Sequence, residues 1–156
     1  VPSPRDVPTY DLAPAMSART VTDRFVENWN RGIYDLVVCN LANGDMVGHT
    51  GVIPAAVTAC ETVDECVGRM EAAVRARNGR MIIIADHGNC EKMLSEDGRP
   101  HTAHTTNRVP FVLVGVAYKD RHLRRDGSLC DIAPTLLEVA GIEKPEQMSG
   151  RTLLEK

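Results

Sequence analysis

The fold class follows from the stretch Met81-Ile82-Ile83-Ile84-Ala85-Asp86-His87-Gly88, in which an apolar, β-branched run changes abruptly into an acid and a histidine. Continuous apolar character is typical of a strand that is covered on both faces, as in a parallel sheet. Packing does not explain Asp86 and His87, because burying either group without a partner costs free energy. In open α/β sheets, ligands and catalytic groups collect at the carboxyl ends of strands. We therefore predict a functional site here.

Two further clusters of polar side chains follow the same logic. The apolar run of residues 34–40 leads to Asp45 and His49, which one helical turn would place on the same face. A threonine-rich loop carries His101 and His104. Two histidines within four residues favour the interpretation that one of them is a metal ligand, but their spacing does not show which one.

Together, the three clusters predict a binuclear metal site. Carboxylate and imidazole groups suit divalent ions such as manganese, zinc or magnesium. Five ligands from three strand-end loops would leave coordination positions open for a substrate. Two ions a few ångströms apart stabilise both oxygens of a phosphoryl displacement, and the chain has no glycine-rich phosphate-binding loop to do this instead.

The remaining sequence predicts alternating helices and strands. We expect one helix from Ser17 to Gly32, a long one over residues 54–77 and a short one from Asp131 to Gly141. The strands are expected at residues 34–40, 80–85 and 109–116, with a polar loop over 86–108. The long helix carries an apolar stripe of Ala56, Cys60, Val63, Val67, Met70 and Val74. This order predicts an α/β fold with a mainly parallel sheet flanked by helices.

Composition narrows the class of protein. A length of 156 residues suits one domain, and a net charge of −3 argues against a nucleic-acid partner. No apolar run is long enough to span a bilayer, and residues 1–5 are no signal peptide. The chain starts without a methionine, which favours a processed product or a piece of a longer protein.

Five cysteines without a Cys-x-x-Cys pair favour reduced thiols in a cytoplasmic protein over a disulfide framework. Cys39 is expected in a buried strand and Cys60 on the apolar helix face. An alternative role for Cys90, three residues after His87, is that of a soft metal ligand, although the neighbouring residues are of the types that bind hard metal ions. The basic runs at residues 119–121 and 124–125 are predicted to be solvated surface, with phosphate contact as the alternative.

Several motifs, in order along the chain, resemble the cofactor-independent phosphoglycerate mutases of the alkaline phosphatase superfamily. They are residues 2–18, 43–51, 85–89, 101–110 and 129–137. Asp-His-Gly alone would not single out this member of the superfamily, but the strings at residues 45–51 and 101–107 do. Gly44 stands where many members have proline, which makes the chain resemble the plant-like branch more than the common bacterial one, and Cys90 stands where many have alanine. Neither departure falls on a ligand.

The resemblance implies a division of the metal ligands. Asp45, His49 and His104 match the ligands of one ion, and Asp86 and His87 match two ligands of the other. An aspartate and a nucleophilic serine, both near the N-terminus of a much longer chain, complete the second site in that family. No serine here resembles that nucleophile, so we expect no catalytic nucleophile in this chain; its serines are Ser3, Ser17, Ser95, Ser128 and Ser149.

The implied protein is an isomerase of glycolysis and gluconeogenesis that interconverts 3-phosphoglycerate and 2-phosphoglycerate through a phosphoserine. Its cofactors would be two divalent ions (manganese, with cobalt, magnesium or zinc as alternatives) and no 2,3-bisphosphoglycerate. Residues 1–156 would be the C-terminal, incomplete piece of a split phosphatase-like domain. Its partners would be phosphoglycerate and the rest of the parent polypeptide, with no nucleic acid and no membrane.

Two alternatives stay open at this point. One is another enzyme of the same superfamily, such as a phosphopentomutase or a phosphatase, which the histidine-rich string at residues 101–107 argues against. The other is a non-catalytic metal-binding module, which metal-dependent mutase activity of the parent chain would exclude.

Overall fold

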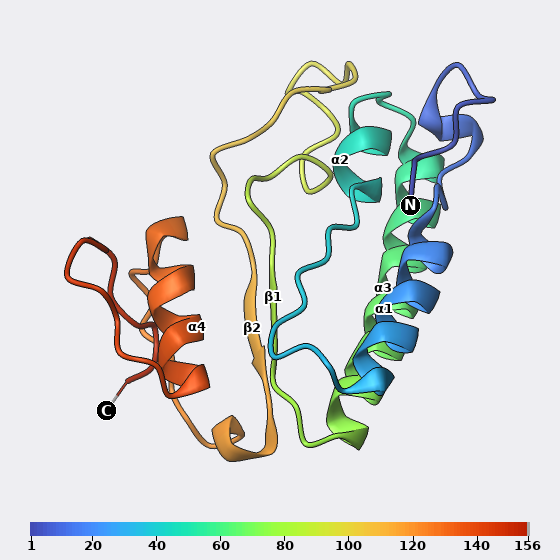
Figure 1. Ribbon diagram of the computed structural model, residues 1–156. Coiled ribbons are helices and arrows are strands. Elements are labelled where there is room, and N and C mark those ends of the chain that lie inside the picture. Colours follow the sequence, from blue (N-terminus) through green and yellow to red (C-terminus); the bar gives the residue numbers. More distant parts are fainter. Residues whose placement is uncertain (156) are drawn as a thin grey trace. The chain divides into compact units, whose positions relative to one another are not determined.

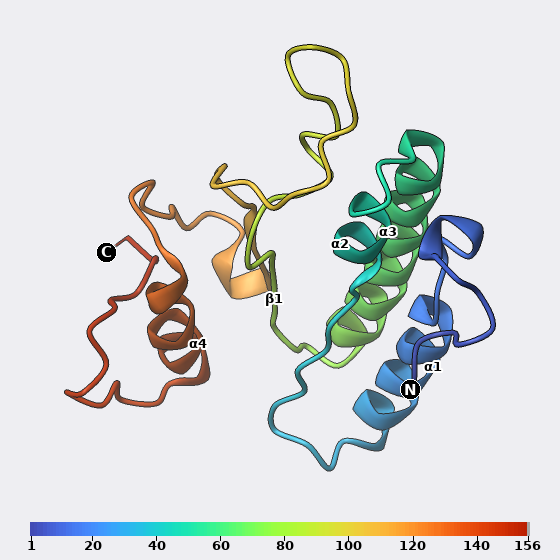
Figure 2. The same ribbon diagram turned by 90° about the horizontal axis from the view of Figure 1, so that it is seen from above.

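Two helices, α1 (Ala18–Arg31) and α3 (Ile53–Ala76), lie side by side in the computed structural model, which describes residues 1–155 (Figures 1 and 2). The indole N–H of Trp29 on α1 donates to the Ala73 carbonyl of α3 at 3.2 Å. Its ring stacks on Phe25, with the ring centroids 6.1 Å apart. An exposed ion pair between Arg19 and Glu65, 2.6 Å long, joins the same two helices.

The helix boundaries confirm the predicted stop signals at glycine. Gly32 adopts a left-handed conformation with φ of 65°, and its N–H donates to the Trp29 carbonyl. Asn78, just after α3, also has a positive φ of 53°, which asparagine tolerates better than most residues. Ser17 is at the N-cap position, but its hydroxyl donates to the Pro2 carbonyl rather than to the helix. The short helix α4 (Ile132–Ala140) ends at Gly141, as expected.

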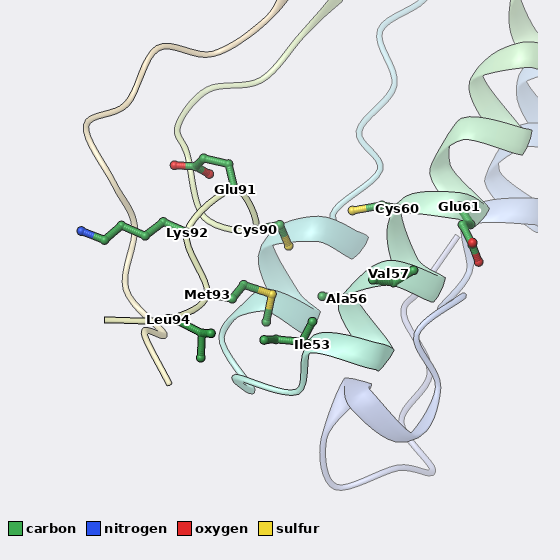
Figure 3. Close-up of a pocket in the computed structure, with 10 residues that line it drawn as sticks. All are labelled: Ile53, Ala56, Val57, Cys60, Glu61, Cys90, Glu91, Lys92, Met93 and Leu94. Atoms are coloured by element: carbon green, nitrogen blue, oxygen red, sulfur yellow. The ribbon is translucent and has the colours of Figure 1, made fainter. Parts of the chain in front are cut away.

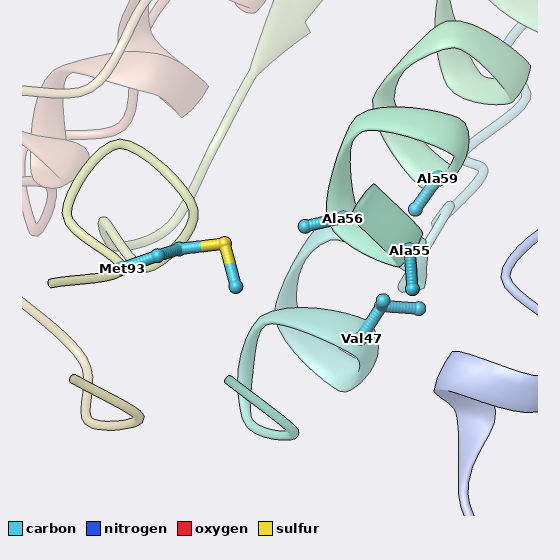
Figure 4. Close-up of a cluster of buried hydrophobic side chains, with 5 residues drawn as sticks. All are labelled: Val47, Ala55, Ala56, Ala59 and Met93. Carbon is cyan, nitrogen blue, oxygen red and sulfur yellow. The ribbon is translucent and has the colours of Figure 1, made fainter. Parts of the chain in front are cut away.

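The core of α3 differs from the predicted stripe. Its buried positions are Ala55, Ala56, Ala59, Thr62, Cys66, Met70 and Val74. Cys60 is exposed, so its expected place on the apolar face was wrong. Successive residues of a helix point about 100° apart, and the row of buried side chains passes through Ala59 instead. Val47 and Met93 form one buried cluster with Ala55, Ala56 and Ala59 of this helix (Figure 4).

The sheet of the described residues has two strands, β1 (Met81–Ile84) and β2 (Phe111–Val114), within the predicted ranges. They pair antiparallel, with Ile82 opposite Leu113, so the mainly parallel sheet is not found in residues 1–155. The predicted strand at residues 34–40 is not formed either. Leu36 and Val38 are 56% and 85% exposed, because this apolar run has no neighbouring strand to pair with, and Cys39 is exposed for the same reason.

The chain divides into two compact units. The first, termed the ligand unit, comprises residues 1–77 and 87–109. It also contains a 3₁₀ turn (Tyr10–Leu12) and the short helix α2 (Asn43–Gly48). The second, the α4 unit, comprises residues 78–86 and 110–155 and includes 3₁₀ turns at Val116–Tyr118 and Leu129–Asp131.

Asp131 organises the α4 unit. Its carboxylate, only 6% exposed, accepts hydrogen bonds from the amides of Ser128 and Arg151 and pairs with Arg124 at 2.8 Å. The Arg151 amide lowers the pKa of Asp131 most, and the Ser128 amide and the Arg124 guanidinium lower it further against the effect of burial. The prediction of a solvated basic run was therefore wrong for Arg124, whose side chain is only 14% exposed.

Among the described residues, no helix combines the length and apolar character needed to cross a membrane.

Candidate metal centre

Helix α2 positions the first two predicted ligands. The Asn43 amide at its start donates to the carbonyls of Pro14 and Ala15 at 2.8 and 2.9 Å, and Val47 is fully buried against α3. These contacts fix the helix, so its opposite face presents Asp45 and His49 one turn apart. Nε2 of His49 lies 3.1 Å from Oδ1 of Asp45, as the spacing predicted.

His104 completes a triangle with these two side chains. Its Nε2 lies 2.9 Å from Oδ1 of Asp45 and 3.0 Å from Nε2 of His49. An ion with bonds of about 2.1 Å at right angles would separate its donor atoms by about 3.0 Å. The three edges of the triangle match that separation.

The tautomer of His49 also fits a metal ligand. Its Nδ1 lies 2.6 Å from the Thr102 carbonyl, which can only accept a hydrogen bond. Nδ1 therefore carries the proton, and in the neutral ring Nε2 turns its lone pair toward Asp45 and His104. Lone pairs this close repel each other unless a proton or a cation lies between them, so the donor set fits a divalent metal ion.

His87 joins the cluster from the loop after β1. Its ring stacks on His104, with the centroids 3.7 Å apart, and its Nε2 lies 3.9 Å from Oδ1 of Asp45. One ligand atom from each of Asp45, His87 and His104 lies within 4.8 Å of the others. Asp45, His49, His87 and His104 thus converge within the ligand unit.

The other two candidates lie elsewhere. Asp86 is exposed and belongs to the α4 unit, at the end of β1. His101 lies outside the triangle's hydrogen bonds: its Nδ1 is 3.1 Å from the Lys92 carbonyl, and its backbone N–H donates to the Met93 carbonyl.

The environment of Asp45 favours its ionised form. Partial burial raises the pKa of this carboxyl, but the Asn89 amide and the imidazoles of His49, His104 and His87 outweigh it and lower the pKa. Asn89, which the sequence reasoning missed, donates from Nδ2 to Oδ1 of Asp45 at 3.0 Å. Its position directly after Asp86-His87-Gly88 was the available signal.

Beside the cluster, a mainly apolar cavity of about 520 Å³ lies between α3 and the loop over residues 90–94 (Figure 3). Cys90 lines it, and the Cys90 thiol donates to the Gly44 carbonyl at 2.8 Å. Burial, followed by the nearby Cys60, raises the pKa of Cys90 to about 11. A protonated thiol bonded to a carbonyl is a poor metal ligand, so the structure gives no support to the alternative role of Cys90.

Comparison with known proteins identifies the family. The metalloenzyme superfamily matches residues 1–144. The chain belongs to this superfamily. The converging lone pairs of Asp45, His49 and His104 are consistent with membership of a metalloenzyme superfamily.

Relatives of this metalloenzyme chain confirm the resemblance to the mutases. It is 56% identical over 154 residues to the 2,3-bisphosphoglycerate-independent phosphoglycerate mutase of Nitratidesulfovibrio vulgaris, and 57% identical over 155 residues to that of Syntrophotalea carbinolica. Each alignment covers 99% of this chain and 30% of the relative. The chain thus spans about 30% of the length of these relatives.

A solved structure has the same fold. Leishmania mexicana phosphoglycerate mutase, crystallised at low cobalt concentration, superposes with a TM-score of 0.88 at 32% identity. The superposition covers 99% of this chain and 31% of that one.

Proposed function

We propose that this chain is the C-terminal, metal-binding part of a cofactor-independent phosphoglycerate mutase. The complete enzyme would interconvert 3-phosphoglycerate and 2-phosphoglycerate in the cytoplasm, through a phosphoserine on a residue outside this chain. The observation that carries the proposal is the triangle of Asp45, His49 and His104, with edges of 2.9 to 3.1 Å. The sequence identity to mutases along the whole chain supports the reaction type.

In this proposal, Asp45, His49 and His104 hold one divalent ion, and Asp86 with His87 supplies two ligands of a second. The contact between His87 and His104 supports two neighbouring sites. The bound ions, manganese or alternatively cobalt, magnesium or zinc, would neutralise the phosphate and stabilise the attacking and leaving oxygens. The residues of this chain direct the Asp45 carboxylate and the Nε2 atoms of His49 and His104 at one point.

The remainder of the parent polypeptide would complete the fold. Residues 33–38 include four large apolar side chains that are at least 50% exposed: Ile33, Tyr34, Leu36 and Val38. A row of unpaired backbone groups beside such side chains is a template for strand pairing. We propose that this run becomes a strand of a mainly parallel sheet in the split phosphatase-like domain.

The alternatives are another phosphotransferase or hydrolase of the same superfamily and a non-catalytic metal-binding module. The identity to the mutases argues against the first. The second would bind metal in the full-length protein without converting phosphoglycerates.

Two preparations test the proposal. Residues 1–156 and the full-length protein are purified, loaded with manganese or cobalt, and assayed for bound metal and for conversion of 3- to 2-phosphoglycerate. We expect metal-dependent conversion by the full-length protein and none by residues 1–156, because the serine nucleophile lies outside them. Robust conversion by residues 1–156 would contradict the division of roles. Metal binding without conversion by the full-length protein would favour the non-catalytic module.

A further inference from the structure

Glu91 connects the two loops that carry His87 and His104. Its Oε2 accepts the backbone N–H of Asn89 at 2.7 Å, two residues after His87. Its Oε1 accepts the Asn107 side-chain amide at 2.9 Å and also the Thr105 hydroxyl. Figure 3 shows this carboxylate pointing away from α3 and the apolar cavity.

The backbone at this junction has little freedom. The Thr105 N–H donates to the Gly88 carbonyl at 2.9 Å, which pairs the residue after His87 with the residue after His104. A Cβ on Gly88 would overlap both the Thr105 hydroxyl and the Glu91 carboxylate. The space beside Gly88 is therefore filled by the hydrogen-bonded pair of Thr105 and Glu91.

The ionised carboxylate of Glu91 fixes which groups donate and which accept in the hydrogen bonds between these segments. The hydrogen bond from Thr105 is the main cause that lowers the pKa of Glu91, with the Asn107 amide and backbone amides adding to it. Because a carboxylate only accepts, the Thr105 hydroxyl must donate to Glu91, and its oxygen then accepts the Asn107 N–H at 3.3 Å. Glu91 contacts the neighbours of both histidines in this way.

We propose that Glu91 is a positioning residue that sets the spacing of His87 and His104, and thereby the affinity and geometry of the metal centre. This inference rests on the proposed function, because it requires that both histidines bind metal. Partners that orient ligands without contacting the ion typically contribute about 10- to 100-fold to metal affinity or activity.

The test compares three variants of the full-length protein. Glu91→Ala removes all three hydrogen bonds, Glu91→Gln keeps an oxygen for Thr105 and Asn107, and Glu96→Ala changes an exposed glutamate in the same loop. The readouts are the cobalt dissociation constant, the visible spectrum of bound cobalt, and kcat and KM at saturating metal. We expect about 10- to 100-fold weaker binding and a changed spectrum for Glu91→Ala, a smaller effect for Glu91→Gln, and none for Glu96→Ala. At saturating metal, kcat should fall with KM unchanged, because Glu91 is not proposed to touch the substrate.

A double-mutant cycle with Thr105→Val separates positioning from general stability. If Glu91 acts through Thr105, the losses in cobalt affinity of the two single variants should not add. An unchanged spectrum and affinity in Glu91→Ala, or strictly additive losses, would overturn this inference and leave the proposed function intact. A wild-type protein that binds no cobalt would overturn both.

Discussion

Asp45 and Asp131 are two aspartates with lowered pKa values in opposite surroundings. Asp131, in the α4 unit, pairs with a permanently charged arginine and accepts two backbone N–H groups. Asp45, in the ligand unit, accepts one side-chain amide and otherwise faces three imidazoles. A carboxylate paired with arginine stabilises the fold, whereas one that faces imidazole nitrogens adds a ligand atom to a binding site. The identity of the neighbours, rather than the carboxylate, thus distinguishes a structural site from a binding site.

The largest effect should come from removing one corner of the triangle. We expect His104→Ala in the full-length protein to lose most of its bound metal and activity. The loss should exceed the roughly 100-fold that a residue orienting a ligand, without contacting the ion, can contribute. His101→Ala should retain much of both, because His101 bonds to the Lys92 carbonyl instead. Metal content and steady-state kinetics measure this, and the reverse ranking would contradict the role assigned to His104.

The two aspartates should separate stability from binding. Asp131→Ala leaves the backbone N–H groups of Ser128 and Arg151 without their acceptor, so we expect a loss of about 1–3 kcal/mol in the free energy of unfolding. Asp45→Ala in the metal-free chain should change it by about 1 kcal/mol or less, because its side chain is one-third exposed. Urea unfolding gives the totals, and hydrogen exchange in α4 should show that the first loss is local. Equal losses would remove the distinction drawn above.

Acid should remove the contribution of Asp131. Because its pKa is lowered in the folded protein, this stabilisation is present above the ordinary aspartate value of about 3.9 and is lost as pH falls through the folded value. The difference in unfolding free energy between wild type and Asp131→Asn should therefore be constant near neutral pH and shrink below about pH 4. A difference that stays constant down to pH 2 would show that ionisation of Asp131 is not what stabilises the unit.

A pair of glycines compares the crowded backbone beside Asn89 with the open surface of α3, where the smallest effect is expected. A Cβ at Gly48 would overlap the side chain of Asn89, the amide donor to Asp45, so Gly48→Ala should cost about 1–3 kcal/mol. Gly68, inside α3, has open space around it, and Gly68→Ala should stabilise the protein by about 0.5–1 kcal/mol. Thermal unfolding of the two variants provides the comparison. If Gly48→Ala and Gly68→Ala were equally stable, the packing of Asn89 against Gly48 would not be tight.

The features predictable from sequence are those set by local patterns. Gly32 and Gly141 end helices, and the four-residue spacing of Asp45 and His49 places them together, because each depends on backbone geometry within a turn or two. The strand predicted at residues 34–40 does not form, because an apolar pattern alone does not supply the hydrogen-bonding partners that a strand requires from elsewhere in the fold.

The supporting residues of the site were missed for a related reason. Asn89 and Glu91 act on side chains brought near by long-range folding: Asp45 is 44 residues from Asn89, and Asn107 is 16 from Glu91. No periodicity in the sequence encodes such pairs. The stacking of His87 on His104 is likewise a product of the Gly88–Thr105 pairing rather than of either motif alone.

Trp29 is the single tryptophan of the chain, and it bonds to α3 and stacks on Phe25. Its intrinsic fluorescence is therefore a built-in optical reporter of the separation of α1 from α3. Residues 78–86 and 110–155 contain no tryptophan, but they include Tyr118, whose hydroxyl donates to the Val139 carbonyl of α4. Tryptophan emission during denaturation would therefore report the ligand unit, and tyrosine emission or hydrogen exchange would follow the melting of α4.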